Sequence, residues 1–282
     1  YLLLMDEKAE LNIEKSIEFQ VENKVAWITI DNQKKGNGLT PEMRNHLIDL
    51  FESFNGQSEI RSAIIIGAGE RFFCTGADLS TSTQNNDNSE GITEPITGEI
   101  RRMMLDGSIK LMNSVIDCEV PVIAAVNGTA AGIGAHLAFC SDLVITSETA
   151  RFIEIFARRG LVPDGLGAWI LPRLIGIQKT KELMFFADDV SAEEALRLGL
   201  CNRAVPASEL ETKSREWAER LAAGPSRSYM FTKWMINKSL DVDRMTLAEY
   251  EAWAVEVNAS TYDSKEGVLS FQEKRTPEWK GY

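Results

Sequence analysis

The sequence has few of the residues that build metal and disulfide sites. It contains two histidines, His46 and His136, and four widely scattered cysteines, with no C-x-x-C pair and no adjacent histidine. Cysteines in this arrangement do not suggest zinc and are typical of reduced, mostly buried thiols in a cytosolic protein. We therefore expect a cytoplasmic protein with no metal site.

Basic residues are outnumbered, and long apolar runs are absent. The 282 residues include 42 acidic and 30 basic side chains, which gives a formal net charge of −12. That charge repels nucleic acid and anionic membranes, and no apolar run approaches the length that spans a bilayer. The sequence thus predicts neither a nucleic-acid partner nor a membrane partner. With 44% hydrophobic residues, it can still bury a sizeable core.

Short apolar strands alternate with helical spacing through the first two thirds of the chain. Residues 17–21 and 25–30 are expected to form a hairpin, and 63–67 a buried strand. Thr40 and Pro41 indicate a helix start, with Thr40 as the cap. This alternation favours parallel strands joined by helices, which is an α/β fold.

The remaining chain divides by composition. Residues 80–98 are mainly Ser, Thr, Asn, Gln, Asp and Glu and are expected to form a loop, whereas helical spacing returns over 100–115. Later segments carry helical spacing too, including 191–199, where Ser191 and Glu194 form a capping box. We expect one unit over 14–205 and a helical C-terminal region over 206–282.

The rest of the chain is arranged around residues 122–138. A Val- and Ile-rich run gives way to small residues, including Gly128, Gly132 and Gly134, and then resumes at helical spacing. This pattern indicates a buried strand, a tight turn and a helix start. Such a turn allows close backbone approach and presents unpaired N–H groups at the positive end of a helix. It can hold an oxygen that carries negative charge.

Three motifs in order give the sequence a family resemblance. Residues 74–79, 121–134 and 160–165 are similar to the enoyl-CoA hydratase/isomerase (crotonase) superfamily, and so are the flanking stretches 37–43 and 266–275. The resemblance implies a repeated ββα spiral core and a helical C-terminal region that forms a homotrimer or a dimer of trimers. It also implies a coenzyme A thioester as substrate, with no cofactor other than the coenzyme A that the substrate carries.

The resemblance also assigns an oxyanion hole. The two backbone N–H donors of the family fall on Ala77 and on Ile133, a position that is usually glycine. A backbone donor tolerates this exchange, although we expect the isoleucine side chain to narrow the space around the thioester carbonyl. Donors of this kind stabilise the charge that develops on an enolate oxygen, and each is worth about 3 kcal/mol.

The acid–base residues depart from the hydratase pattern. The two glutamates of hydratases fall on His136 and Phe156, whereas Asp164 occupies the place of the catalytic aspartate in some isomerases. We expect Asp164 to carry a proton between two carbons of one extended enolate, which shifts a double bond. Alternatively, Asp164 only caps the helix that follows. Glu154 could replace the missing glutamate if the local register slips.

Two other functions stay open. His136 could act with Asp164 in a hydratase or a C–C bond hydrolase, or it could be a buried histidine satisfied by the backbone. The protein could also be a non-catalytic acyl-CoA-binding homologue that has lost both glutamates.

The remaining site residues are expected to contact the substrate. Lysines at 34 and 35 and near the C-terminus would bind phosphates, and apolar side chains would line the acyl pocket. The residues predicted to bind substrate or coenzyme A are Lys34, Lys35, Asp78, Leu79, Gly132, Phe156, Trp169, Phe271 and Lys274.

Overall fold

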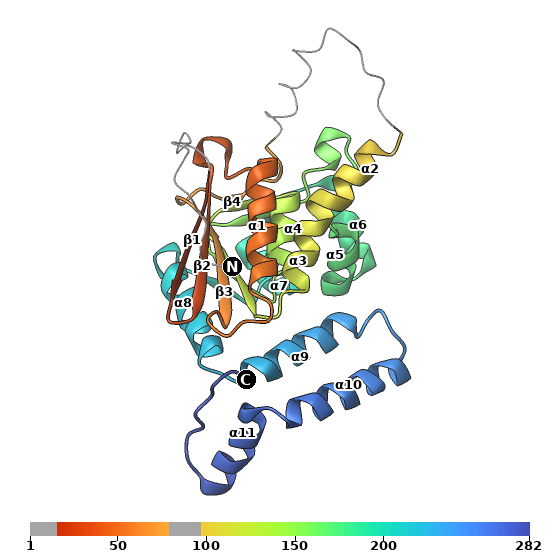
Figure 1. Cartoon of the computed structure of the whole chain (residues 1–282). Helices are drawn as coiled ribbons and strands as arrows, with labels where there is room; N and C mark the ends of the chain where they lie inside the picture. Colours follow the sequence, from red (N-terminus) through yellow and green to blue (C-terminus); the bar gives the residue numbers. More distant parts are fainter. Residues whose placement is uncertain (1–15, 79–96) are drawn as a thin grey trace.

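A computed structural model describes residues 16–78 and 97–282, whose strands form two sheets (Figure 1). The larger sheet has the strand order β1-β2-β3-β5-β7-β10, and the smaller has the order β4-β6-β8-β9. The larger sheet consists of β1 (Ser16–Glu22), β2 (Val25–Asp31), β3 (Ser62–Gly67), β5 (Val122–Val126), β7 (Leu143–Ser147) and β10 (Arg203–Val205). The smaller consists of β4 (Phe72–Cys74), β6 (Thr129–Ala131), β8 (Arg151–Ile153) and β9 (Val190–Ser191).

The strand pairing repeats one unit along the chain. The predicted hairpin is confirmed, because β1 and β2 pair antiparallel, and every other pair in the larger sheet is parallel. Strands β3, β5 and β7 of the larger sheet are followed by β4, β6 and β8 of the smaller one, and helices follow each pair. This is the expected ββα repeat.

Twelve helical segments with five or more residues occur in the part of the chain that the structure describes. Two predicted caps are confirmed: the side chains of Thr40 and Ser191 accept hydrogen bonds from the N–H groups of Met43 and Glu194. The segments are α1 (Pro41–Ser53), α2 (Glu99–Met104), η4 (Leu105–Ile109), α3 (Lys110–Ile116), α4 (Ile133–Phe139), α5 (Gly167–Ile175), α6 (Ile177–Phe186), α7 (Ala192–Leu198), α8 (Leu210–Ala222), α9 (Ser226–Lys238), α10 (Arg244–Ala259) and α11 (Tyr262–Glu273).

The helix predicted over 100–115 is present but not regular. A π-helical turn, η4, separates α2 from α3, and Gly107 inside it has non-helical dihedral angles of φ −108° and ψ −107°. π-Helical turns are often found at functional sites. The loop predicted over 80–98 lies, up to residue 96, outside the described residues.

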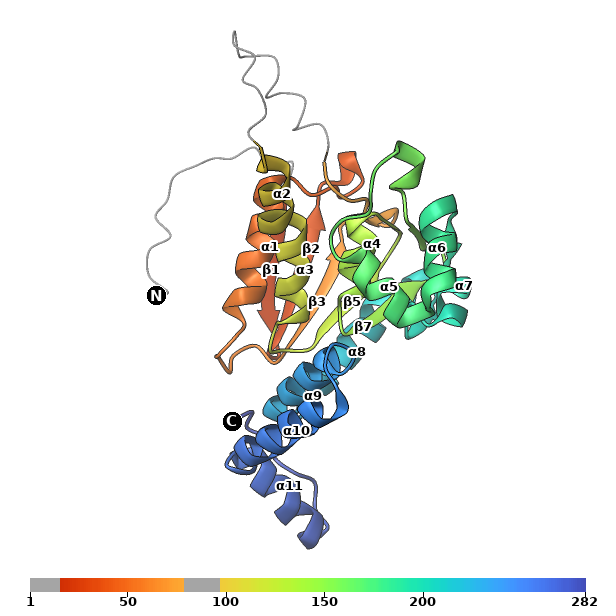
Figure 2. The same cartoon turned by 90° about the vertical axis from the view of Figure 1, so that its right-hand side faces the viewer.

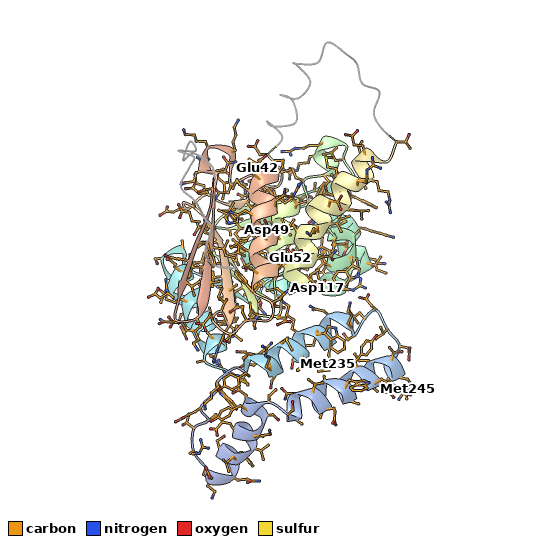
Figure 3. The ribbon with its side chains drawn as sticks, viewed as in Figure 1. Glu42, Asp49, Glu52, Asp117, Met235 and Met245 are labelled. Carbon is orange, nitrogen blue, oxygen red and sulfur yellow. The ribbon has the colours of Figure 1, made fainter. Side chains whose placement is uncertain are left out.

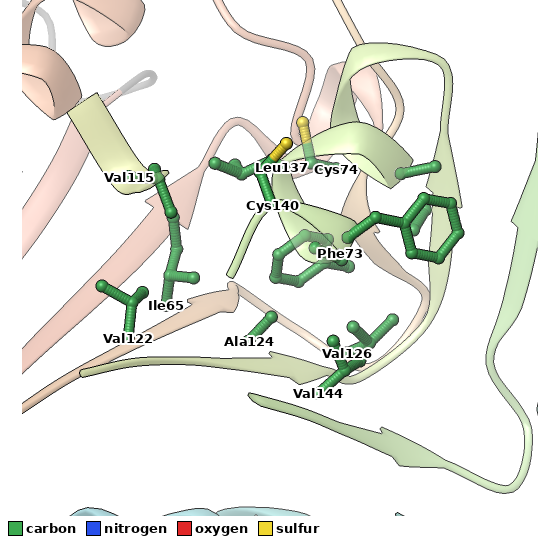
Figure 4. Close-up of a cluster of buried hydrophobic side chains, with 14 of the residues drawn as sticks. Ile65, Phe73, Cys74, Val115, Val122, Ala124, Val126, Leu137, Cys140 and Val144 are labelled. Atoms are coloured by element: carbon green, nitrogen blue, oxygen red, sulfur yellow. The ribbon is translucent and has the colours of Figure 1, made fainter. Parts of the chain in front are cut away.

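The core fills both faces of the larger sheet. Ile65 of β3 contributes to a cluster with α1, α3 and α4, whereas its neighbour Ile64 contributes to a second cluster with α8. Figure 4 shows the first cluster, where Val122 and Ala124 of β5 lie below Leu137 of α4. Alternation along each strand produces the two layers.

Helix α1 shows how the surface is separated from this core. Figure 3 shows Glu42, Asp49 and Glu52 along α1, and all three are exposed. The buried side of the same helix supplies Met43, Leu47, Ile48 and Phe51 to the first cluster.

Helices α9, α10 and α11 extend away from the sheets, at the opposite end of the molecule from α2 (Figures 1 and 2). Lys233 of α9 joins this region to the core: its Nζ donates to the carbonyls of Val115 and Val120 and pairs with Asp142 at 2.7 Å. Because α8 packs on the larger sheet, the core elements continue past residue 206. The domain boundary at residue 206 stays a prediction. No described helix is long and apolar enough to cross a membrane.

Candidate active site

The turn after β4 and the start of α4 touch because of one glycine. A Cβ atom on Gly134 would lie 2.0 Å from the carbonyl oxygen of Cys74, so the first turn of α4 packs directly on the end of β4. Only glycine permits this approach. The same contact brings Gly76 to α4, since a Cβ there would lie 3.9 Å from the Ile133 nitrogen.

This contact places the two predicted oxyanion donors beside each other. Ile133 is the first residue of α4, and Gly132 before it has φ +55°. The Leu39 N–H donates to the Gly76 carbonyl and the Asp78 N–H to the Leu39 carbonyl, which fixes the turn on both sides of Ala77. Within residues 16–78 and 97–282, neither the Ala77 N–H nor the Ile133 N–H has a hydrogen-bond acceptor. Two such N–H groups, one at a helix N-terminus, can stabilise an anionic oxygen.

The Ile133 side chain packs between two turns of the site, and its effect on the space around a thioester carbonyl stays a prediction. It is 7% exposed and belongs to the first core cluster. Its branches approach two glycines: a Cβ on Gly76 would lie 3.8 Å from Cγ1, and one on Gly165 would lie 3.1 Å from Cγ2. Ile133 therefore acts as a spacer between the oxyanion turn and the turn that carries Asp164.

Asp164 lies in the turn before α5, where it does not act as the N-cap. The cap position belongs to Leu166, and no side chain caps the helix. The Oδ2 atom of Asp164 instead accepts a hydrogen bond from Ser108 Oγ in η4, at 3.4 Å. The interpretation of Asp164 as only a helix cap is therefore wrong.

The surroundings of Asp164 favour proton binding at its carboxylate. Burial raises the pKa of this group above its ordinary value, and the charge of His136 and the Ser108 hydrogen bond lower the pKa again in part. Its Oδ1 atom is buried and has no partner among the described residues. A half-buried carboxyl group with a raised pKa is suited to general acid–base chemistry.

His136 and Glu154 form a buried pair next to this turn. The Nε2 atom of His136 lies 3.1 and 3.0 Å from the two carboxylate oxygens of Glu154. Phe156 stacks on the same imidazole, with ring centroids 5.5 Å apart. Glu154 and Phe156 thus both contact the ring, although β8 ends at Ile153, and the Glu154 carboxylate is bound to His136. It does not take the place of the missing glutamate.

Some predicted coenzyme A contacts lie near the oxyanion turn. Lys34 and Lys35 are exposed in a 3₁₀ turn, and the Lys35 carbonyl accepts a hydrogen bond from the Thr75 hydroxyl at 3.4 Å. Asp78 is buried, and Asn32 Nδ2 donates to its carboxylate at 3.4 Å. Leu79 lies outside the described residues.

The other predicted contacts lie elsewhere. Trp169 stacks under the Arg173 guanidinium at 4.1 Å and lines hollows between α5 and α9, so the structure does not group it with Phe156 around Asp164. Phe271 is 84% exposed on α11, and Lys274 ends that helix. Because α11 lies at the far end of the molecule, these two residues stay predictions that depend on a neighbouring subunit (Figure 1).

Ser108 is the residue at the candidate site that the sequence analysis missed. The sequence carries no signal for it, because Leu105 and Ile109 on either side keep ordinary helical spacing. The π-helical turn η4 directs the Ser108 hydroxyl toward Asp164.

Comparison with known proteins shows the family of this chain. The family model described as enoyl-CoA hydratase/isomerase matches residues 20–282. The chain is 34% identical to a probable enoyl-CoA hydratase of Rhodobacter capsulatus, covering 94% of this chain and 98% of that protein. It is 30% identical to the 1,2-epoxyphenylacetyl-CoA isomerase of Escherichia coli, covering 93% and 97%.

A solved structure shows the same fold. The crystal structure of an enoyl-CoA hydratase from Bacillus anthracis matches with a TM-score of 0.85 and 31% identity, covering 95% of this chain and 100% of that one. The fold and site define a protein with paired main-chain N–H groups at a helix start and a half-buried carboxyl group on the next turn. The chain belongs to the enoyl-CoA hydratase/isomerase family.

Proposed function

We propose that this protein is an acyl-CoA enzyme that shifts a carbon–carbon double bond of its substrate. The Ala77 and Ile133 N–H groups bind the thioester oxygen, and the Asp164 carboxylate removes a proton from one carbon. The bonding electrons move onto the thioester oxygen as an enolate. Asp164 then returns the proton to another carbon of the same system, so no atom is gained or lost.

The observation that carries this proposal is the position of Asp164. Its carboxylate is held by Ser108 next to the Ile133 spacer, with a raised pKa and one oxygen without a partner among the described residues. A base for carbon acids benefits from a raised pKa, because the strength of the base grows with it. The substrate class rests on the relatives, several of which are named for acyl-CoA substrates.

Hydration is the second candidate, favoured by relatives that are named as hydratases. It needs a second group to activate or protonate water. His136 is 0% exposed and bound to Glu154, so it is poorly placed to touch a substrate. We therefore favour isomerisation, with Asp164 as the proton carrier.

The test is exchange of the α-proton of acyl-CoA thioesters in deuterated water, followed by mass spectrometry of the products. We expect the wild-type protein to accelerate exchange and to yield an isomer of equal mass once the deuterium is accounted for. Asp164→Asn should lower the rate by about 10²- to 10⁴-fold. Wild-type exchange in the Asn variant would refute the role of Asp164. Incorporation of ¹⁸O from water would establish hydration or hydrolysis, and no exchange with any thioester would identify a non-catalytic binder.

The acyl group is to be found with a panel of linear, branched, aromatic and cyclic thioesters. The panel should be run at one concentration in deuterated water, with deuterium incorporation followed by mass spectrometry, because an isomer has the mass of its substrate.

A further inference from the structure

Glu154 and His136 form a buried hydrogen-bonded pair to which the proposed reaction gives no role. Glu154 follows β8, and His136 lies in α4, so the pair joins two elements of the core. The side chains are 4% and 0% exposed, respectively. A carboxylate this deeply buried is costly unless a cation or several donors compensate for it. The single partner that it has among the described residues is the imidazole.

The other edge of the imidazole is directed at the Asp164 turn. A Cβ on Gly165 would lie 3.5 Å from Nδ1, and a Cβ on Gly167 would lie 2.2 Å from Nε2 and Cε1. The two glycines therefore make the space that the ring occupies. Nδ1 is buried and has no hydrogen-bond partner in residues 16–78 and 97–282, and the same is true of Asp164 Oδ1.

The contact between Nε2 and Glu154 fits one charge state of the ring. When Nε2–H donates to an ionised Glu154, the pair is electrically neutral only if Nδ1 also carries a proton. That N–H is then a donor facing the turn that holds an unpaired carboxylate oxygen. The ring then carries a positive charge that is held by a charge-assisted hydrogen bond to Glu154 and acts on Asp164 through space, since no hydrogen bond joins Nδ1 to that carboxylate.

We propose that Glu154 is a positioning residue that holds His136 as an imidazolium, and that His136 is the cationic partner of the Asp164 carboxylate. The proposal rests on the proposed function, because Asp164 is the group that it serves. Glu154 does not touch the substrate; it acts through the ring.

Other neighbours of Asp164 supply no competing charge within the described residues. On the α4 side of Asp164, the charged group is His136, and Glu154 at the end of β8 contacts the opposite side of the ring. From η4 the neighbour is the neutral Ser108 hydroxyl. Phe156 covers the face of the imidazole and keeps it apolar. Removing the Glu154 charge therefore changes the charge of His136 and, through it, the charge that acts on Asp164.

The first experiment is ¹⁵N NMR of the full chain with labelled histidine at pH 8, where an ordinary exposed histidine is neutral. The chain has only two histidines, and the exposed His46 serves as an internal reference, identified by its loss in His46→Gln. We expect both ring nitrogens of His136 to have the shift of protonated nitrogen. In Glu154→Gln, one of them should change to the shift of an unprotonated nitrogen. A neutral His136 in the wild type would overturn the proposal without any variant having to fold.

The second experiment is the pH profile of kcat/KM for proton exchange. Glu154→Gln should move the acid limb upward by about one pH unit, because Asp164 loses its cationic partner. Glu154→Asp, which keeps the charge, should restore the wild-type limb even if its rate is lower, and Glu148→Gln on the surface is the matched control. A limb that stays in place or moves downward in Glu154→Gln would contradict the proposal.

The two experiments separate this inference from the proposed function. If wild-type protein fails to catalyse exchange, the proposed function is wrong, while the NMR spectrum still reports the charge of His136. If exchange occurs but His136 is neutral, only the inference fails.

Discussion

The two halves of the site are held by different means. The proposed oxyanion donors are main-chain groups, and the contact between Gly134 and the Cys74 carbonyl holds their two turns together. The proposed proton-transfer half is made of side chains from η4, α4, the end of β8 and the turn before α5. The main-chain half tolerates isoleucine at position 133 but no added volume at position 134. The side-chain half depends on residue identity, and it is here that this chain differs from the hydratase pattern.

The largest effect is expected from breaking the main-chain half with Gly134→Ala. The new methyl group would overlap the Cys74 carbonyl, so α4 must shift and the two N–H donors separate. Turnover should fall by about 10²- to 10³-fold, as for removal of one oxyanion donor. Overpacking should also cost about 1–3 kcal/mol of unfolding free energy, measured by denaturant titration.

The control for this variant is Gly56→Ala, which places a methyl group in open space at φ +71°, far from the site. It should lose about 1 kcal/mol of stability through backbone strain and keep its turnover. Wild-type turnover in Gly134→Ala would mean that the contact with the Cys74 carbonyl does not determine how the two N–H donors are placed.

The next effect is expected from breaking the side-chain half with Gly167→Ala. Its Cβ would lie 2.2 Å from His136, so the ring must leave the place where it meets Glu154. We expect kcat to fall by up to about 10²-fold, because small displacements of catalytic groups are costly, while affinity for an acyl-CoA thioester stays unchanged. Steady-state kinetics and equilibrium binding measure the two quantities.

Gly176→Ala is the matched control at the other end of α5. Its methyl group meets nothing within 4 Å, so any loss there reports backbone strain at φ +76° alone. If Gly167→Ala weakens acyl-CoA binding as much as it lowers kcat, the side-chain half also contributes to binding. The distinction drawn between the two halves of the site is then wrong.

The same difference explains which parts of the site could be predicted from sequence. The glycines at 132 and 134 imply a close backbone approach at the start of a helix, and the family resemblance assigned the two donors to Ala77 and Ile133. The hairpin and the caps at Thr40 and Ser191 are local, and they were predicted correctly.

Side-chain partners could not be predicted in this way. Ser108 lies 56 residues before Asp164, and Glu154 lies 18 after His136, so only the folded core brings either pair together. Trp169 is the opposite case, a residue close to Asp164 in sequence that does not lie beside it in the fold. It faces α9, because this side of α5 points away from Asp164. Helix α11 falls in the region predicted to be helical, but its own bounds were not predicted, because its exposed apolar residues, such as Phe271, do not form a periodic core stripe.

A smaller effect is expected when Asp164 loses its hydroxyl donor. Ser108→Ala removes a hydrogen bond that lowers the pKa of Asp164, so the acid limb of kcat/KM should move upward. One hydrogen bond of about 1 kcal/mol corresponds to about a fivefold lower rate near the limb. Ser114→Ala is the control, because its hydroxyl only returns to the Leu111 carbonyl of its own helix. An unchanged profile in Ser108→Ala would show that Ser108 merely fills space.

The smallest effect is expected on the stability of Asp164→Asn. This substitution should abolish activity but raise stability at neutral pH. Burial raises the pKa of Asp164 in the folded state above the ordinary value of 3.8, so the folded protein binds this proton more tightly than the unfolded chain. The resulting stability is fully present below the unfolded pKa and is lost as pH rises through the folded pKa. At pH 7 the charged carboxylate is therefore a cost that Asp164→Asn removes.

We expect Asp164→Asn to be inactive yet to melt at a higher temperature than the wild type at pH 7, with the difference shrinking as the pH falls toward 4. Asp243 provides a control of opposite sign: hydrogen bonds from Thr246 and Met245 lower the pKa of this exposed cap, so Asp243→Ala should melt lower at pH 7. Calorimetry at several pH values measures both. If Asp164→Asn were less stable than the wild type at neutral pH, the carboxylate would be a structural anchor, and the side-chain half would be held as firmly as the main-chain half.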